Sequence, residues 1–269
     1  MSNVFSTGIG DNMKIAYLID ASREIDEQHV ADACDLANSL SATVCGVAFS
    51  EESVEHLPAV DGYFVDDDSA IGRRIEELFD VASRAFKTSF ERYDVPTQWV
   101  ETRGYLNTFW SEYSPYFDFA ITTEGYGAPA IANAGITPAV QLSPNRSSQI
   151  MNGHGLIAWN GSLQSGRAVR ASLPILKKLA SVEVLTINPN SEHILFDIGD
   201  YLASHQISAK VTSLISSESE ISNMIINQTQ ETDLLVMGAY GVSMMLEKWF
   251  GGVTEDVSKR CQSHVIFAK

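Results

Sequence analysis

Two halves of this 269-residue sequence repeat one order of apolar strands and amphipathic helices. Each half opens with an apolar strand that ends in a polar turn, at 14–22 and again at 154–162. In the first half the pattern predicts further strands at 43–49, 97–101, 118–123 and 139–142, and helices at 26–40, 71–93 and 107–113. In the second half it predicts strands at 182–187, 234–237 and 264–268, a helix at 168–179 and another from Thr254. A repeat of this length indicates that one folding unit is used twice.

Strands that alternate with helices at this spacing are typical of a parallel sheet with helices on both faces. We therefore predict an α/β fold of two flavodoxin-like doubly wound repeats, each with a five-stranded parallel sheet. The segment from Ser143 to Gly153 is polar and contains proline and glycine, so it is predicted to link the repeats. The predicted domains are residues 1–145 and 146–269.

Glycines follow the apolar run Leu234–Met237 at a regular spacing. Gly238 and Gly241 follow the run with two residues between them. After nine further residues come Gly251 and Gly252, and then Val253 and Thr254. Glycine between a strand and a helix N-terminus lets the backbone approach a phosphate, which the free N–H groups of the helix then bind. A turn that needs positive φ explains scattered glycines equally well, so only their spacing indicates a phosphate site.

The spacing G-x2-G-x9-G, continued by Gly-Val-Thr, resembles the nucleotide signature of the universal stress protein family. In ATP-binding members of that family the last glycine precedes Ser or Thr; here Gly252 takes that place, and Thr254 keeps a hydroxyl. The resemblance is close over 233–269 and extends back to His154. Asn160 stands where the family has an aspartate that faces adenosine, which alters the polarity of that contact. The resemblance implies an adenine-nucleotide site made of Ala158, Asn160, Ile187, Met237, Gly238, Gly241, Gly251, Gly252, Val253 and Thr254.

The first half lacks this glycine pattern. Its fourth predicted strand is followed by Glu124 and a shorter loop, and Pro129 stands where the phosphate-binding turn would be. Proline offers no N–H to an anion, and a carboxylate repels one. Asp20 keeps the acid that faces adenosine in the family. We therefore predict one nucleotide site per chain, in the second half.

The last strand of each half is short and apolar, at 139–142 and 264–268. Left at the edge of a sheet, each strand would expose a row of unpaired backbone groups. In the family that the sequence resembles, closing strands commonly pair between two units. We therefore predict that these two strands pair within the chain and give a pseudo-two-fold molecule, while a homodimer of whole chains stays open.

The net charge of −16 is concentrated in the first half. Residues 1–150 hold nine Lys and Arg against twenty-three Asp and Glu, and the rest of the chain holds nine against eleven. Such a surface repels a nucleic-acid backbone, so no nucleic-acid partner is expected. The sequence shows neither a signal peptide nor an apolar run that would cross a membrane, so we expect a cytoplasmic location and no membrane contact. The three cysteines and six histidines show no metal-ligand spacing.

No catalytic motif is recognisable, which makes ligand binding the main predicted function. The predicted ligand is ATP, or ADP or AMP, with Mg²⁺ within reach of Thr254 if a triphosphate is bound. Only Lys248 is basic between Gly241 and Gly251, which argues against strong triphosphate binding. We expect a stress-response sensor or regulatory protein with an unknown protein partner. A nucleotide-free scaffold of the same fold and a slow ATPase are the alternatives.

Overall fold

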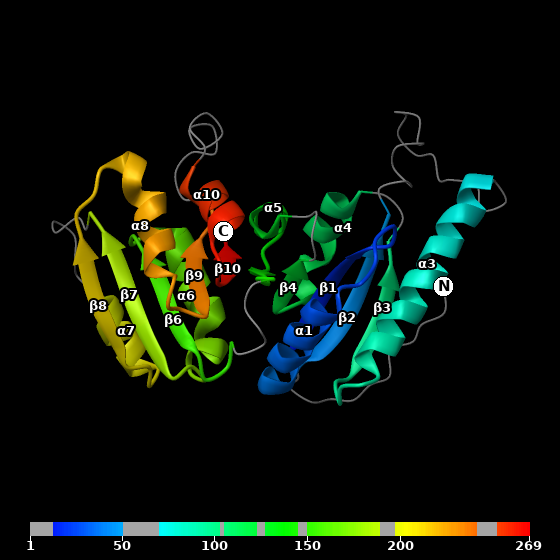
Figure 1. Cartoon of the computed structure of the whole chain (residues 1–269), viewed down its shortest axis with the longest axis horizontal. Helices are drawn as coiled ribbons and strands as arrows, with labels where there is room; N and C mark the ends of the chain where they lie inside the picture. The colour runs from blue at the N-terminus through cyan, green and yellow to red at the C-terminus, as the bar shows by residue number, and fades with distance from the viewer. Residues whose placement is uncertain are drawn as a thin grey trace.

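The computed structural model describes residues 13–50, 70–102, 105–122, 127–144, 150–188, 197–240 and 252–269. Ten strands form one continuous sheet in the order β3-β2-β1-β4-β5-β10-β9-β6-β7-β8. Figure 1 shows the two halves of this sheet meeting near the middle of the molecule, with helices on both sides of each half.

The first half has the strand order β3-β2-β1-β4-β5, and these neighbours run parallel. Its order along the chain is β1 (Lys14–Asp20), α1 (Glu27–Leu40), β2 (Thr43–Phe49), α3 (Ala70–Phe90), β3 (Thr97–Glu101), α4 (Leu106–Tyr113), the 3₁₀ turn η1 (Ser114–Tyr116), β4 (Phe119–Thr122), α5 (Ala128–Ala134) and β5 (Ala139–Gln141). The chain adds strands on one side of β1 and then returns to the other, which is doubly wound topology.

The second half repeats this topology as β10-β9-β6-β7-β8. Its elements are β6 (His154–Trp159), α6 (Leu163–Leu176), β7 (Ser181–Ile187), α7 (Ile198–Ser204), β8 (Ala209–Leu214), the 3₁₀ turn η3 (Glu218–Glu220), α8 (Ile221–Gln228), β9 (Leu234–Gly238), α10 (Val253–Arg260) and β10 (His264–Ala268). The predicted α/β architecture of two doubly wound repeats is therefore confirmed.

Apolar side chains alternate between the two faces of the sheet. Along β1, Ile15, Tyr17 and Ile19 belong to the apolar cluster that α1, α3, α6 and α7 cover. Ala16 and Leu18 belong to the cluster on the other face, which α4, α5, α8 and α10 cover. Because a strand turns successive side chains to opposite faces, a strand buried on both sides reads as a continuous apolar run.

The helices that follow β1 and β6 begin in the same way. Asp26 caps α1 by accepting hydrogen bonds from the backbone N–H groups of Gln28 and His29. Ser162 caps α6 by accepting one from Ser165 N. The sequence analysis predicted that the first helix of the second half begins at Ala168, which is wrong by five residues, because α6 begins at Leu163. The first turn of α6 has no apolar spacing, and only the Ser162 cap marks it.

The two halves join through antiparallel pairing of β5 with β10, in which Val140 lies opposite Ile266. Side chains reinforce this junction. Gln141 Nε2 donates to Ser258 O at 2.7 Å, and Ser258 Oγ donates to Gln141 Oε1 at 2.8 Å. Ser143 N donates to the ring nitrogen Nδ1 of His264 at 3.1 Å. The predicted edge-to-edge pairing is therefore confirmed, and it leaves neither closing strand exposed.

The proposed domain boundary at 145 and 146 lies outside the described residues, as do Glu124 and the segment 241–251. The division into domains stays a prediction. In the described part of the chain, no helix combines the length and the apolar character that a membrane span requires.

Candidate functional site

A cavity of about 220 Å³ lies at the carboxyl ends of β6 and β9. These two strands are neighbours in the sheet but not in the chain. In the sheet, β7 and β8 lie on one side of β6, and β9 and β10 lie on its other side. Open α/β sheets bind ligands at this position, where the strand order reverses and the adjoining loops diverge. The place of the cavity thus follows from the topology.

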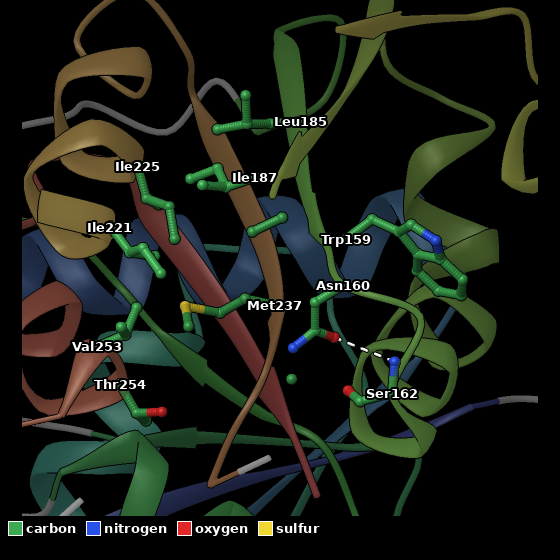
Figure 2. A pocket seen from close by; sticks show the side chains of 12 residues that line it. Trp159, Asn160, Ser162, Leu185, Ile187, Ile221, Ile225, Met237, Val253 and Thr254 are labelled. Carbon is green, nitrogen blue, oxygen red and sulfur yellow. Dashed lines mark hydrogen bonds between the residues drawn. The ribbon is translucent and has the colours of Figure 1, made fainter. Parts of the chain in front are cut away.

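The walls of the cavity are mainly apolar, and they come from three strands and two helices. Figure 2 shows Leu185, Ile187 and Met237 on the strands facing Ile221 and Ile225 of α8, with Val253 and Thr254 of α10 below them. Asn160 and Ser162, in the turn after β6, supply polar groups on the other side. An apolar pocket with a few polar groups at one rim can hold a flat heterocycle and orient its substituents.

Most of the site residues predicted from the sequence meet at this cavity. Seven of them line it: Ala158, Asn160, Ile187, Met237, Gly238, Val253 and Thr254. Gly252 is the N-cap residue of α10 and lies next to the lining residues. Gly241 and Gly251 lie outside the described residues. What these residues do toward a ligand stays a prediction.

Sequence reasoning missed five lining residues: Trp159, Ser162, Leu185, Ile221 and Ile225. Leu185 is two residues before Ile187, and strand alternation puts both on one face, so that signal was available. Ile221 and Ile225 are one helical turn apart on a short helix. Nothing in their own sequence connects that helix with β6; only the fold brings it over the cavity.

The orientation of the Asn160 amide follows from its hydrogen bond. Its Oδ1 accepts from the backbone N–H of Ser162 at 3.1 Å. A backbone N–H can only donate, so the oxygen must face it and the Nδ2 group must point elsewhere. Figure 2 shows Nδ2 turned toward the cavity, on the side of Met237. The site therefore presents a hydrogen-bond donor here, where an aspartate would present an acceptor.

Two acidic residues sit in the first turn of α10. Glu255 forms an ion pair with Lys259 at 3.1 Å, and the Asp256 carboxylate accepts from the Ser222 hydroxyl at 2.8 Å. Both carboxylates favour the helix N-terminus, because they compensate its partial positive charge. The Thr254 hydroxyl accepts from Tyr240 N at 3.3 Å. This helix N-terminus therefore carries less unopposed positive charge than its backbone alone would supply.

Gly238 has a packing role that the sequence did not indicate. A Cβ at this position would lie 2.6 Å from Ser165 N and 2.7 Å from the carbonyl carbon of Gln164. Both atoms belong to the first turn of α6, and backbone atoms cannot move aside as a flexible side chain can. A glycine here lets β9 and the first turn of α6 approach closely.

Solved structures with the same arrangement share little sequence with this chain. A universal stress protein from Archaeoglobus fulgidus superimposes with a TM-score of 0.68 at 13% identity, covering 94% of this chain and 96% of that chain. A putative universal stress protein from Pseudomonas aeruginosa gives a TM-score of 0.55 at 14% identity, covering 96% and 94%. A functionally unknown protein from the same species gives 0.56 at 13%, covering 96% and 93%. No protein-family model and no curated protein sequence matches the chain.

The chain has the universal stress protein fold. The match to the Archaeoglobus universal stress protein extends over nearly the whole length of both chains, so both halves of this chain take part in it. At this identity the likeness concerns the fold alone.

Each half of this universal stress protein fold has a position equivalent to the cavity, and the strand registers make the halves comparable. Lys14 pairs with Thr43 as His154 pairs with Ser181, so Leu18 corresponds to Ala158 and Phe49 to Ile187. The helices α4 and α8 both have eight residues, and Trp110 occupies the place of Ile225. At each of these three positions the first half has the larger side chain, and two of the three, Phe49 and Trp110, are aromatic.

These larger side chains fill the first half. Leu18, Phe49 and Trp110 are at most 2% exposed and belong to one apolar cluster. The Trp110 ring stacks on Phe117 with centroids 5.7 Å apart, and its Nε1 donates to Ile131 O at 3.1 Å. Among the described residues, the first-half positions equivalent to Ala158, Ile187 and Ile225 are thus held by larger, packed side chains.

Asp20, the acid retained in the first half, is also engaged within the protein. Its carboxylate accepts from Ser22 N at 3.0 Å and from Ser22 Oγ at 2.7 Å, and forms an ion pair with Arg23 at 3.2 Å. The Ser22 N–H plays the part that the Ser162 N–H plays for Asn160. The turn therefore has the same hydrogen bond in both halves, and in the second half it borders the cavity.

Proposed function

We propose that this protein is a regulatory nucleotide-binding protein, a stress-response sensor that holds one adenine nucleotide in its second half. The observation that carries the proposal is the convergence of seven residues, implied by the resemblance of the sequence, on one apolar cavity at the carboxyl ends of β6 and β9. A cytoplasmic location and an unknown protein partner belong to the same proposal.

The cavity has the size of a base rather than of a whole nucleotide. Sites for drug-sized ligands measure roughly 300–1,000 Å³, and this cavity has about 220 Å³. In the proposed complex adenine packs between Ile187 and Met237 on the sheet and Ile225 on α8. The ribose lies near Asn160, and the phosphates point toward the backbone N–H groups of Gly252 and Val253.

The charge around α10 favours a nucleotide with few phosphates. Glu255 and Asp256 lie in the first turn of the helix, where the phosphates would come. None of the described residues that line the cavity is basic. AMP or ADP is therefore the preferred ligand, and ATP binds more weakly unless Mg²⁺ reduces its charge.

A thermal-shift titration tests this proposal, because a ligand that binds only the folded state raises the melting temperature. Adenosine, AMP, and ATP with and without Mg²⁺ are compared with GMP at equal concentrations. We expect the adenine compounds to raise the melting temperature and GMP to leave it nearly unchanged. Calorimetry with AMP should give about one site per chain. Two equal sites, or no shift with any adenine compound, would contradict the proposal.

A nucleotide-free scaffold is the second candidate, and one contact favours it. The Thr254 hydroxyl already accepts a hydrogen bond from Tyr240 N, so it is engaged within the protein without a ligand. This candidate predicts a melting temperature that no nucleotide changes. Slow ATP hydrolysis, the third candidate, requires a group that activates water. The described lining residues include no carboxylate and no histidine, so we expect turnover near the background rate.

A further inference from the structure

A second cavity, of about 700 Å³, lies between α6 and the beginning of α7. It is on the other side of the sheet from the first cavity, because α6 and α7 cover one face while α8 and α10 cover the opposite one. Trp159 and Ser162, at the end of β6, contribute to both cavities. In Figure 2 the Trp159 ring points toward α6, away from Met237 and Ile225.

The floor and sides of this second cavity are apolar and aromatic. Val169 and Ile198 are buried, and Trp159 and Tyr201 are half-buried. The Tyr201 ring is fixed by an edge-on contact with His205, with ring centroids 4.8 Å apart. Flat indole and phenol rings beside an apolar floor provide stacking surfaces for a planar ligand.

Two glycines leave room in this cavity. Ideal Cβ atoms built on Gly161 and on Gly166 would meet no atom within 4 Å. Gly161 has φ +72°, so the turn itself requires glycine there. Gly166 lies inside α6, where glycine costs about 1 kcal/mol relative to alanine. No neighbouring atom of the protein requires a glycine there, and the missing side chain leaves space in the cavity beside α6.

Positive charge gathers at this cavity in a strongly acidic protein. Arg167 and Arg170 are three residues apart on α6, and both line the cavity. Arg167 donates to Lys269 O at 3.0 Å, and Arg170 forms no ion pair within the part of the chain that the structure describes. Asp197 also lines the cavity, but its carboxylate is turned to Gly199 N, where it caps α7.

We propose that this second cavity is a binding site for a small aromatic carboxylate. The ring stacks against Trp159 and Tyr201, and the carboxylate pairs with the guanidinium group of Arg170, with Arg167 beside it. Arginine suits this partner because its planar group can donate two parallel hydrogen bonds to a carboxylate. The net charge of −16 repels larger polyanions, which restricts the ligand to one or two negative charges. The proposal does not depend on nucleotide binding in the first cavity.

Calorimetry with 1-naphthoate tests the proposal, and 1-naphthamide is the uncharged control with the same ring. We expect one naphthoate site per chain and at least about tenfold weaker binding of the amide, the usual size of one charge-assisted contact. Trp159→Phe should remove the fluorescence change that naphthoate causes. Equal affinity for acid and amide, or no binding of naphthoate to the full chain, would overturn the proposal.

Matched variants locate the site. Gly166→Leu fills the cavity and should abolish naphthoate binding without lowering the melting temperature, because leucine suits a helix better than glycine. Gly166→Ala adds one methyl group in open space and should keep binding within about threefold. Arg170→Gln should weaken binding about tenfold, whereas Arg260→Gln on α10 should leave it unchanged. Ala158→Leu, which fills only the first cavity, should also leave it unchanged. Binding that survives Gly166→Leu or disappears in Ala158→Leu would place the ligand elsewhere.

Discussion

The second half leaves open a space that the first half fills with protein. The strand order, the register between the first two strands and the length of the helix above the site are the same in both. Three substitutions between equivalent positions account for the difference: Leu18 for Ala158, Phe49 for Ile187 and Trp110 for Ile225. One backbone can thus be a ligand site or a packed core, according to side-chain volume at the end of the sheet.

The helices on the other face differ in a similar way. Both α1 and α6 have fourteen residues and a side-chain cap at the residue before them. At the sixth position α1 buries Asp32, whereas α6 buries Ala168. Compared with the second half, the first half therefore has larger side chains on one face of the sheet and a buried ionisable group on the other. Substitutions at these first-half positions should therefore change the free energy of unfolding, while substitutions in the cavity of the second half should change ligand affinity.

The largest expected effect is on the stability of the first half. Trp110→Ala should lower the free energy of unfolding by about 3–5 kcal/mol, because it leaves a large void and removes the hydrogen bond to Ile131 O. The equivalent change Ile225→Ala enlarges a cavity that already exists and should cost only about 1–2 kcal/mol. Urea denaturation of both variants measures the difference. Equal losses would mean that the first half is no better filled than the second.

The second prediction concerns pH and Asp32. Burial raises the pKa of Asp32 to about 6, and the hydrogen bond from Gln28 opposes the shift. A raised carboxyl pKa means that the folded protein binds the proton more tightly than the unfolded chain, so stability falls as the pH rises from about 4 to about 6. The cost above that window is roughly 2–3 kcal/mol.

Asp32→Asn isolates this contribution, because the amide stays neutral and keeps an oxygen for Gln28. At pH 7 the variant should be more stable than the parent by roughly 2 kcal/mol, and near pH 4 the two should coincide. Denaturation curves at several pH values between 4 and 8 give the comparison. Ala168→Ser in α6 is the control, since it should give a difference that does not change with pH. A constant difference for Asp32→Asn would disprove the linkage.

The sequence predicted the strands better than the helices. The ranges Thr43–Phe49 and Thr97–Glu101 are confirmed to the residue, since each is an apolar or alternating run with clear ends. The start of α6 could not be found from apolar spacing, because Leu163 is exposed and the first turn is held by Ser162. The pairing of β5 with β10 was predictable, because two short apolar strands had to cover each other's edges.

Five of the twelve residues that line the candidate site were not predicted, and two of them, Ile221 and Ile225, lie there through contacts that only the fold creates. Asn160, Met237 and Thr254 could be named because the resemblance to the universal stress protein family covers them. Ile225 and Trp110 could not, since each is an ordinary apolar residue on a short helix. From the missing glycines and Pro129 the sequence predicted only that the first half lacks the phosphate site; the packing of Leu18, Phe49 and Trp110 at this position was not predicted. A sequence pattern identifies a lost loop more easily than a filled cavity.

The third prediction transfers a residue of the first half to the second. Ala158→Leu introduces the side chain that Leu18 has, and it should fill the floor of the cavity. We expect the Kd for AMP to rise at least about thirtyfold, with a stability change below about 1 kcal/mol because the space is open. Calorimetry measures the first and urea denaturation the second. Ala158→Ser, which keeps the volume small, should bind AMP as the parent does; if Ala158→Leu does so too, the base lies outside this cavity.

The smallest expected effect concerns the polarity of the turn after β6. Asn160→Asp gives the second half the residue that Asp20 provides in the first, and the turn tolerates it because Ser22 N bonds Asp20 as Ser162 N bonds Asn160. The free carboxylate oxygen would then face the cavity as an acceptor in place of the Nδ2 donor. Ribose hydroxyls can donate to it, so adenosine should bind about three- to tenfold more tightly, and AMP should gain less because its phosphate is repelled.

Asn160→Ala separates this effect from the loss of the turn itself, since it removes both the donor and the bond to Ser162 N. Calorimetry with adenosine and AMP on the three proteins gives the comparison. If Asn160→Asp weakens adenosine binding as much as Asn160→Ala does, the ligand accepts a hydrogen bond from Nδ2, and the donor is then what distinguishes this site from one built around an aspartate. If Asn160→Asp strengthens adenosine binding, an aspartate equivalent to Asp20 favours the ligand in the second half. The two halves then differ in the side chains beside that aspartate, which leave a cavity in the second half and are packed in the first.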